Sequence, residues 1–311
     1  MGGTAHLAVV LVTRRPLSLY IHFPWCIQKC PYCDFNSHTL KNMLDQSQYV
    51  QALIDDLSLY KAYLQGGLVS IFCGGGTPSL FSAQSLQPLF DYLSEHCDWK
   101  CNEVTLEANP GTVDCEQFAG YRALGINRLS LGVQSFQSRH LEALGRIHNG
   151  DDACQAIETI QSVGFEQFNL DLMYGLPGQT VETMQADIQR AQSFDPPHLS
   201  WYQLTLEPNT AFAHRPPRNL PDDNTLAQWT HSGNSLLTQR HHRYEISAYS
   251  SAAKNQCQHN RHYWEYGDYL GIGAGAHSKL TMPDHIVRHS LTKHPKLYLK
   301  QTPKARIQSI H

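Results

Sequence analysis

Residues 25–33 read WCIQKCPYC and contain Cys26, Cys30 and Cys33, separated by three and then two other residues. This spacing lets one tight loop direct three thiolates toward one face of a small inorganic cluster. A 4Fe-4S cluster held by three protein sulfurs leaves one iron open, whereas a cluster with four thiolates only carries electrons. The open iron can chelate the amino and carboxylate groups of S-adenosylmethionine, which is then cleaved reductively to a carbon radical. The motif therefore predicts a 4Fe-4S cluster that binds S-adenosylmethionine.

Zinc is the alternative occupant of such a motif. A structural zinc site needs a fourth Cys or His at similarly short range. The residues that follow are Asp34, Phe35, Asn36 and Ser37, and the first histidine is His38. The motif therefore favours the cluster over zinc, and a simple zinc or electron-transfer module is the weakest interpretation.

The composition is that of an ordinary globular protein in a reducing compartment. The chain has 311 residues, 41% of them hydrophobic, which is enough for one large or two ordinary domains. Its 24 Lys and Arg against 27 Asp and Glu give a net charge of −3, which does not indicate a nucleic-acid surface. Nine cysteines, an odd number, fit free thiols and a metal cluster better than a disulfide framework. We therefore expect a cytoplasmic protein.

The N-terminal residues predict neither a membrane span nor a secretory signal. The apolar run His6–Val12 is too short to cross a bilayer, and Arg14 and Arg15 follow it instead of preceding it. No acidic residue occurs before Asp34, so a targeting role stays open. We expect residues 1–16 to be an extension and the chain to have no transmembrane segment, with peripheral membrane contact left open.

The rest of the chain alternates between strand and helix patterns, which predicts a parallel sheet. Candidate strands are Leu17–His22, Val69–Phe72, Glu103–Glu107, Arg128–Val133, Phe168–Met173 and Leu199–Leu204. Candidate helices are Gln46–Tyr63, Gln84–Glu95, Glu116–Leu124, Asp152–Val163 and Val181–Phe194. We therefore expect an α/β fold, a partial (β/α)6 TIM-like barrel over residues 17–213. A proline-rich stretch near Pro216 separates it from a smaller C-terminal extension, residues 214–311, with a helix at about Thr225–Gln239 and a strand at Arg243–Tyr249.

Several polar or glycine residues lie at or just beyond the carboxyl ends of these strands: Cys26, Gly76, Glu107, Gln134 and Asp171. In barrels of parallel strands, the carboxyl ends of the strands form the catalytic face. Agreement among independent segments is stronger evidence for a site than any single motif. We therefore expect these side chains to share one site.

Four features have both a functional and a purely structural interpretation. The glycines of GGGTP, residues 74–78, let backbone approach a ligand closely, although most such runs are only turns. Arg146 could pair with the carboxylate of the cofactor, and Glu107 could accept hydrogen bonds from ribose hydroxyls. Tyr20 could pack on the cluster or the adenine. Each of these side chains is equally compatible with a buried group that satisfies its neighbours.

The stretch Cys257–His277 is unusually rich in histidine and aromatic residues, among them His259, His262, Tyr263 and Trp264. A flat macrocycle with a central iron needs an imidazole for the metal and aromatic faces for the ring. The alternative is an amphipathic loop that packs on the barrel with surface histidines. Composition alone favours that alternative.

At this point the sequence resembles a known family, the HemW heme chaperones of the radical SAM superfamily, long described as similar to oxygen-independent coproporphyrinogen III oxidases. The resemblance runs from about Leu17 to about His294. It rests on the segments YIHFPWC (20–26), CPYCDFNSH (30–38), GGGTPS (74–79), EANPG (107–111), GVQSF (132–136), LGRIH (144–148), NLDLMYGLPGQT (169–180), HLSWYQLTLEPNT (198–210) and HNRHYW (259–264).

The resemblance implies roles for individual residues. It implies that Cys26, Cys30 and Cys33 hold the cluster, and that His259, in an HNxxYW motif associated with heme binding, ligates heme, with His262 as the second candidate. The positions that match S-adenosylmethionine contacts are Tyr20, Gly75, Gly76, Thr77, Glu107, Gln134, Arg146 and Asp171. The implied partners are heme and apo-haemoproteins, with respiratory-chain proteins as the candidate recipients.

Two departures separate this sequence from the true oxidases, the alternative function. The oxidases carry a fourth cysteine two residues after the third, where this chain has Phe35, and they have a longer N-terminal segment. Both differences favour a chaperone over radical decarboxylation of coproporphyrinogen III, so we assign no catalytic residue. The family also continues into a further C-terminal domain, and we expect the present extension to be incomplete.

Overall fold

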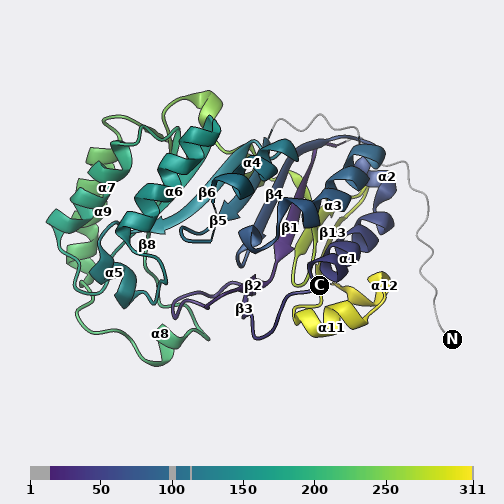
Figure 1. Cartoon of the computed structure of the whole chain (residues 1–311), viewed down its shortest axis with the longest axis horizontal. Coiled ribbons are helices and arrows are strands. Elements are labelled where there is room, and N and C mark those ends of the chain that lie inside the picture. The colour runs from purple at the N-terminus through teal and green to yellow at the C-terminus, as the bar shows by residue number, and fades with distance from the viewer. Residues whose placement is uncertain (1–14, 98–102, 113, 310–311) are drawn as a thin grey trace.

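The computed structural model describes residues 15–97, 103–112 and 114–309. They fold around one twelve-stranded sheet with the strand order β14-β13-β12-β11-β1-β4-β5-β6-β7-β8-β10-β9 (Figure 1). The first fourteen residues of the predicted N-terminal extension lie outside the described residues.

Six parallel neighbours form the middle of this sheet, as the sequence predicted. They are β1 (Leu17–Phe23), β4 (Leu68–Gly75), β5 (Glu103–Ala108), β6 (Arg128–Gln134), β7 (Gln167–Tyr174) and β8 (His198–Gln203). In the strand order, β1 and β8 lie at opposite ends of this parallel series and are not neighbours. The α/β class and the partial barrel are therefore confirmed.

Helices cover one face of the sheet, and neighbouring helices pack against one another. The main ones are α1 (Gln46–Leu59), α3 (Ala83–His96), α4 (Cys115–Ala123), α6 (Gly150–Val163), α7 (Val181–Gln192) and α9 (Asp223–Leu237). Each begins after a polar side chain that accepts a hydrogen bond from the first turn: Asp45, Ser82, Asp114, Asn149, Thr180 and Asp222. Shorter helices are α2 (Lys61–Leu64), α5 (Ser138–Ala143) and α8 (Ala211–His214).

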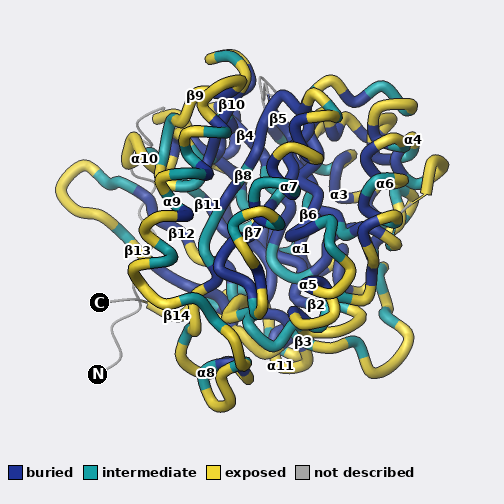
Figure 2. The backbone as a smooth tube through the Cα atoms, turned by 90° about the vertical axis from the view of Figure 1, so that its left-hand side faces the viewer, coloured by how far each residue is buried: buried dark blue, intermediate teal, exposed yellow. Residues whose placement is uncertain are grey.

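The two faces of the parallel strands differ in chemistry because successive side chains point to opposite sides. On β6, Leu129, Leu131 and Val133 belong to the fully buried apolar core. The alternate residues of that strand include Arg128 and Ser130, which belong to the polar face. Figure 2 shows these strands as the buried centre of the molecule. The polar face of the parallel strands thus supplies polar groups for a site.

The C-terminal segment extends both edges of this sheet. On one edge β10 (Ala248–Ser250) pairs antiparallel with β8, and β9 (His242–Arg243) follows it. On the other edge β11 (Asp268–Ile272) pairs parallel with β1, followed by β12 (His277–Thr281), β13 (Ile286–Leu291) and β14 (Ile307–Ser309). The boundary between residues 213 and 214 stays a prediction, since the strands beyond it continue one sheet.

One local expectation differs from the structure. The strand expected at Arg243–Tyr249 is a hairpin of β9 and β10, because the Arg243 guanidinium and the Glu245 carboxylate bond to the backbone of the turn between them. Near the C-terminus, α11 (Pro295–Lys300) and α12 (Pro303–Arg306) pack beside α1 (Figure 1). None of the helices in the described ranges combines the length and apolar character needed to span a bilayer.

Candidate functional site

The three motif cysteines lie in a loop that two short strands close. β2 (Trp25–Cys26) and β3 (His38–Thr39) pair in parallel, below the main sheet in Figure 1. Inside the loop the Cys33 amide donates to the Cys30 carbonyl at 3.1 Å, and the Lys29 amine donates to the carbonyls of Phe35 and Ser37. Cys26, Cys30 and Cys33 are free, half-buried thiols that line one cavity of about 140 Å³. The loop therefore presents all three sulfurs to one space.

Glycines let the end of β4 lie directly against this loop. The Gly76 amide donates to the Phe23 carbonyl and the Thr77 amide to the Trp25 carbonyl, both at 2.7 Å. A Cβ on Gly76 would stand 2.5 Å from the Trp25 carbonyl oxygen. Gly75 has a φ of +113°, which favours glycine. The contact between the two segments thus requires glycine here.

Two carboxyl groups line the same cavity from β5 and β7. The Gly75 amide donates to Glu107 Oε2 at 3.0 Å. Burial, and secondly the nearby Asp171, raise the pKa of Glu107 to about 8. Burial also raises the pKa of Asp171, although Asn169 and Ser130 donate hydrogen bonds to its carboxylate. Burial thus disfavours the charged form of both acids. A ligand that donates hydrogen bonds or brings a cation would stabilise that charged form.

Arg146 connects the cysteine loop to the strands. Its Nη1 lies 3.5 Å from Cys30 Sγ, and its Nη2 donates to Asn109 Oδ1 at 2.6 Å and to the Gly132 carbonyl at 2.8 Å. The guanidinium is thus placed to balance negative charge on the thiolates as well as on a ligand carboxylate.

The cavity also contains residues that the sequence analysis missed. Asn109 donates to Thr77 Oγ1 at 3.0 Å, and the Tyr202 hydroxyl donates to Gln134 Oε1 at 2.7 Å. Asn109 follows β5, and Tyr202 lies near the end of β8. The argument that the carboxyl ends of parallel strands form the site, which predicted Glu107, could therefore have predicted both residues.

Tyr20 lies in a second, larger cavity of about 540 Å³. Its hydroxyl is 3.0 Å from His22 Nδ1, and its ring stacks on Phe72. Phe35, Gly75 and Glu107 line both cavities, so the two are neighbours. All the predicted cluster and S-adenosylmethionine residues except Tyr20 line the cysteine cavity.

The histidines of the HNRHYW segment lie on helix α10 (Gln258–Trp264), not on a loop. His259 is 2% exposed; its Nδ1 is 2.8 Å from Ser70 Oγ, and its Nε2 is 3.1 Å from the Tyr263 hydroxyl. His262 is buried, with Nε2 2.7 Å from the Asp268 carbonyl oxygen. Burial lowers the pKa of His259 to about 3, so the ring is neutral. In this structure both ring nitrogens of His259 already have partners, which differs from the expected accessible heme ligand.

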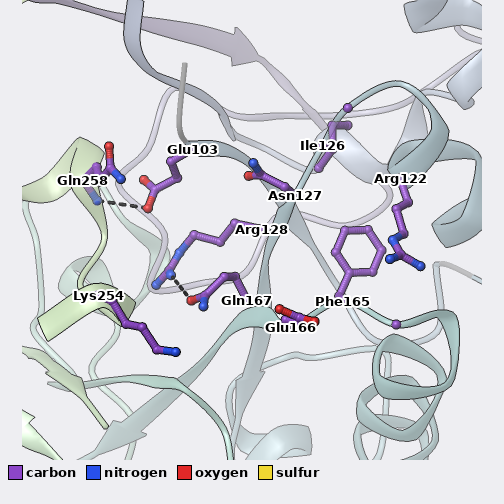
Figure 3. Close-up of a pocket in the computed structure, with 12 residues that line it drawn as sticks. Glu103, Arg122, Ile126, Asn127, Arg128, Phe165, Glu166, Gln167, Lys254 and Gln258 are labelled. Carbon is purple, nitrogen blue, oxygen red and sulfur yellow. Dashed lines mark hydrogen bonds between the residues drawn. The ribbon is translucent and has the colours of Figure 1, made fainter. Parts of the chain in front are cut away.

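A third cavity, of about 410 Å³, lies at the opposite end of β5, β6 and β7 (Figure 3). There Glu103 accepts hydrogen bonds from the Gln258 and His259 amides and so holds the first turn of α10. Arg128 Nη1 lies 3.5 Å from Gln167 Oε1. This cavity contains none of the site residues predicted from the sequence.

The cysteine cavity fits an iron–sulfur cluster. It combines three thiols, an arginine donor on one of them and a glycine segment that a Cβ would displace. In the ranges that the structure describes, no three His, Cys, Asp or Glu side chains surround one point closely enough to hold a single metal ion. A cubane presents separate irons to separate sulfurs and does not require that convergence.

Comparison with known proteins identifies the family to which the chain belongs. Residues 20–191 match the Radical SAM superfamily. The chain is 52% identical over 293 residues to the heme chaperone HemW of Haemophilus influenzae, covering 92% of this chain and 76% of that protein. It is 50% identical over 294 residues to the heme chaperone HemW of Escherichia coli, covering 93% and 77%.

Among solved structures, the chain resembles coproporphyrinogen III oxidase (HemN) from Escherichia coli, a radical SAM enzyme. The TM-score is 0.83 at 25% identity, covering 99% of this chain and 74% of that one. The sequence identity to these two chaperones is thus about twice that to the oxidase.

Proposed function

The chain belongs to the HemW family of heme chaperones within the radical SAM superfamily, and from this premise we propose that it binds heme and delivers it to apo-haemoproteins. The observation that carries the proposal is the pair of neighbouring cavities. One collects three thiols and the polar strand ends, and the other is roomy and lined by aromatic side chains.

We assign the cysteine cavity to the 4Fe-4S cluster and S-adenosylmethionine. Cys26, Cys30 and Cys33 would hold the cluster, whose open iron chelates the methionine part of the cofactor when both are bound. The backbone of Gly75 and Gly76, with Thr77, would bind the amino group, and Arg146 the carboxylate. Glu107, Gln134 and Asp171 would accept or donate hydrogen bonds to the ribose, while Tyr20 would border the site from the second cavity.

The alternative function is oxidative decarboxylation of coproporphyrinogen III. The fold supports it, because the solved oxidase superposes on nearly the whole chain. Sequence identity and Phe35, which stands where the oxidases have a fourth cysteine, both favour the chaperone. We therefore propose no enzymatic turnover of coproporphyrinogen. Respiratory-chain proteins as recipients and a cytoplasmic location remain parts of the proposal.

Anaerobic reconstitution followed by heme titration tests the proposal. We expect about four iron and four sulfide per chain, a heme-dependent Soret shift, and no loss of carboxyl groups from coproporphyrinogen III under reducing conditions. Replacing Cys26, Cys30 or Cys33 by Ala should abolish the cluster. Cys73→Ala, at a buried position in the apolar core, is the matched control and should retain it. Robust coproporphyrinogen turnover without heme binding would contradict the chaperone function, and stoichiometric zinc without sulfide would contradict the cluster.

A further inference from the structure

The larger cavity has a lining that suits one flat, mostly apolar ligand with a metal at its centre and acidic edges. Its aromatic walls include Phe35, Tyr263 and Tyr269, and its polar groups include His277 and Lys293. Its volume, about 540 Å³, is within the roughly 300–1,000 Å³ typical of small-molecule sites. Building on the proposed function, we propose that heme binds in this cavity, with His277 as an axial ligand of the iron and Lys293 paired with a propionate.

The aromatic side chains that line this cavity are exposed to solvent, which indicates a binding site for an apolar ligand. Phe35 is 60% exposed and Tyr263 is 39% exposed, although both face a cavity in the protein. Tyr263 meets Tyr269 edge to face, with ring centroids 4.7 Å apart. Large apolar surfaces of this kind usually mark a binding site, and a porphyrin ring would cover them.

His277 is the histidine of this cavity that is free to bind iron. The other one, His22, is 3.0 Å from the Tyr20 hydroxyl through Nδ1 and 2.8 Å from the Asn36 carbonyl oxygen through Nε2. His277 begins β12, is exposed, and makes no side-chain hydrogen bond to any residue that the structure describes. Partial burial, and secondly Lys293, lower the pKa of His277, which favours the neutral imidazole that metals bind.

The charges of the cavity orient the ligand. Lys293 is exposed and close enough to His277 to lower its pKa, and Asp34 and Glu107 also line the cavity. The Lys293 ammonium would attract a propionate. Heme would therefore enter with a propionate toward Lys293.

The HNRHYW segment takes a different role in this arrangement. Tyr263 is its member that lines the cavity, and His259 Nε2 holds the Tyr263 hydroxyl at 3.1 Å. His259 is thus a positioning residue for an aromatic wall. Its loss should loosen the pocket without removing an iron ligand.

Titration of the reconstituted full chain with ferric heme distinguishes these roles. We expect His277→Ala to raise the Kd about tenfold or more and to shift the Soret band, with added imidazole restoring the band. His259→Ala should raise the Kd while leaving the band position of bound heme unchanged. His285→Ala, at an exposed histidine elsewhere, is the control for adventitious binding and should change neither.

A ligand variant tests the Lys293 contact without relying on protein stability. Lys293→Gln should weaken binding of heme but not of heme dimethyl ester, which lacks free carboxylates. The inference is wrong if His277→Ala leaves both Kd and Soret band unchanged, or if His259→Ala alone shifts the band. In either result heme still binds and the proposed function survives. Failure of the unaltered chain to bind heme would instead contradict the proposed function and this inference together.

Discussion

Glu107 is a buried carboxyl group of the site whose charged form is unfavourable in the folded protein. Its carboxyl group accepts a hydrogen bond from the Gly75 amide and lies near Asp171. Burial of the carboxyl, and secondly the nearby Asp171, raise its pKa to about 8, from an ordinary value of 4.5. A ligand that donates hydrogen bonds to Glu107 would relieve this cost, which is how a residue can be unfavourable for stability and favourable for binding.

This shift predicts a pH dependence of stability. Between about pH 4.5 and 8 the folded protein keeps a proton on Glu107 that the unfolded chain has released. Raising the pH through this window therefore lowers the free energy of unfolding. We expect the melting temperature of the cluster-free protein to fall between pH 5.5 and 8.5, and Glu107→Gln to reduce that fall by about 2–4 °C.

Thermal unfolding over a pH series measures this effect. The exposed Glu116 of α4 provides the control, and Glu116→Gln should leave the profile unchanged. If the Glu107→Gln profile runs parallel to that of the unaltered protein, Glu107 does not carry the shifted pKa.

At the scale of elements, the site depends on the junction between the end of β4 and the cysteine loop. The Gly76 and Thr77 amides bond to carbonyls on either side of Pro24, so two backbones meet without side chains between them. The position of Cys26 is thereby tied to the glycine segment.

Gly76→Ala should disrupt this junction. The added methyl group would stand 2.5 Å from the Trp25 carbonyl oxygen and 2.8 Å from that of Phe23, so the backbone must shift. Overpacking of this kind costs about 1–3 kcal/mol. We expect a lower melting temperature and reduced iron content after reconstitution. Gly66→Ala, whose Cβ would meet its nearest neighbour at 3.6 Å, should change neither quantity, and equal iron content in both variants would refute the argument.

The elements that the sequence predicted are those with strong local patterns. The six parallel strands and their helices alternate with a clear period, and polar caps such as Asn149 mark helix starts. β11 could not be predicted in the same way, because its partner β1 is far away in the sequence and the pairing is purely tertiary. The hairpin β9–β10 needed knowledge of side chains that bond to a turn.

The same distinction holds for the candidate site. Glu107 and Asp171 lie on parallel strands and Cys26 follows β1, so the sequence could group them, and the structure places them in one cavity. Whether His259 offers a free nitrogen depends on Ser70 and Tyr263, and contacts of that kind do not appear in a motif.

At the scale of the whole molecule, a buried ion pair joins the beginning of the barrel to the end of the described chain. Arg306 Nη1 of α12 donates to Asp56 Oδ1 of α1 at 2.7 Å. Asp56 also accepts hydrogen bonds from the Tyr298 hydroxyl and, at 3.2 Å, from the Gly273 amide. Both charged side chains are almost fully buried. The last segment is therefore integral to the packing of α1 against the sheet.

Breaking this pair should destabilise the whole fold. Arg306→Met leaves a buried carboxylate without its cation, and Asp56→Asn leaves a buried guanidinium without its anion; each loss typically costs about 3–5 kcal/mol. The double variant removes both charges, so we expect it to be more stable than the sum of the two single losses implies. Arg261→Ala, which removes an exposed i,i+4 pair with Glu265, should cost about 0.5 kcal/mol or less. Chemical denaturation of the four variants and the unaltered protein measures these differences. Strictly additive losses would mean that Asp56 and Arg306 stabilise the fold independently of each other.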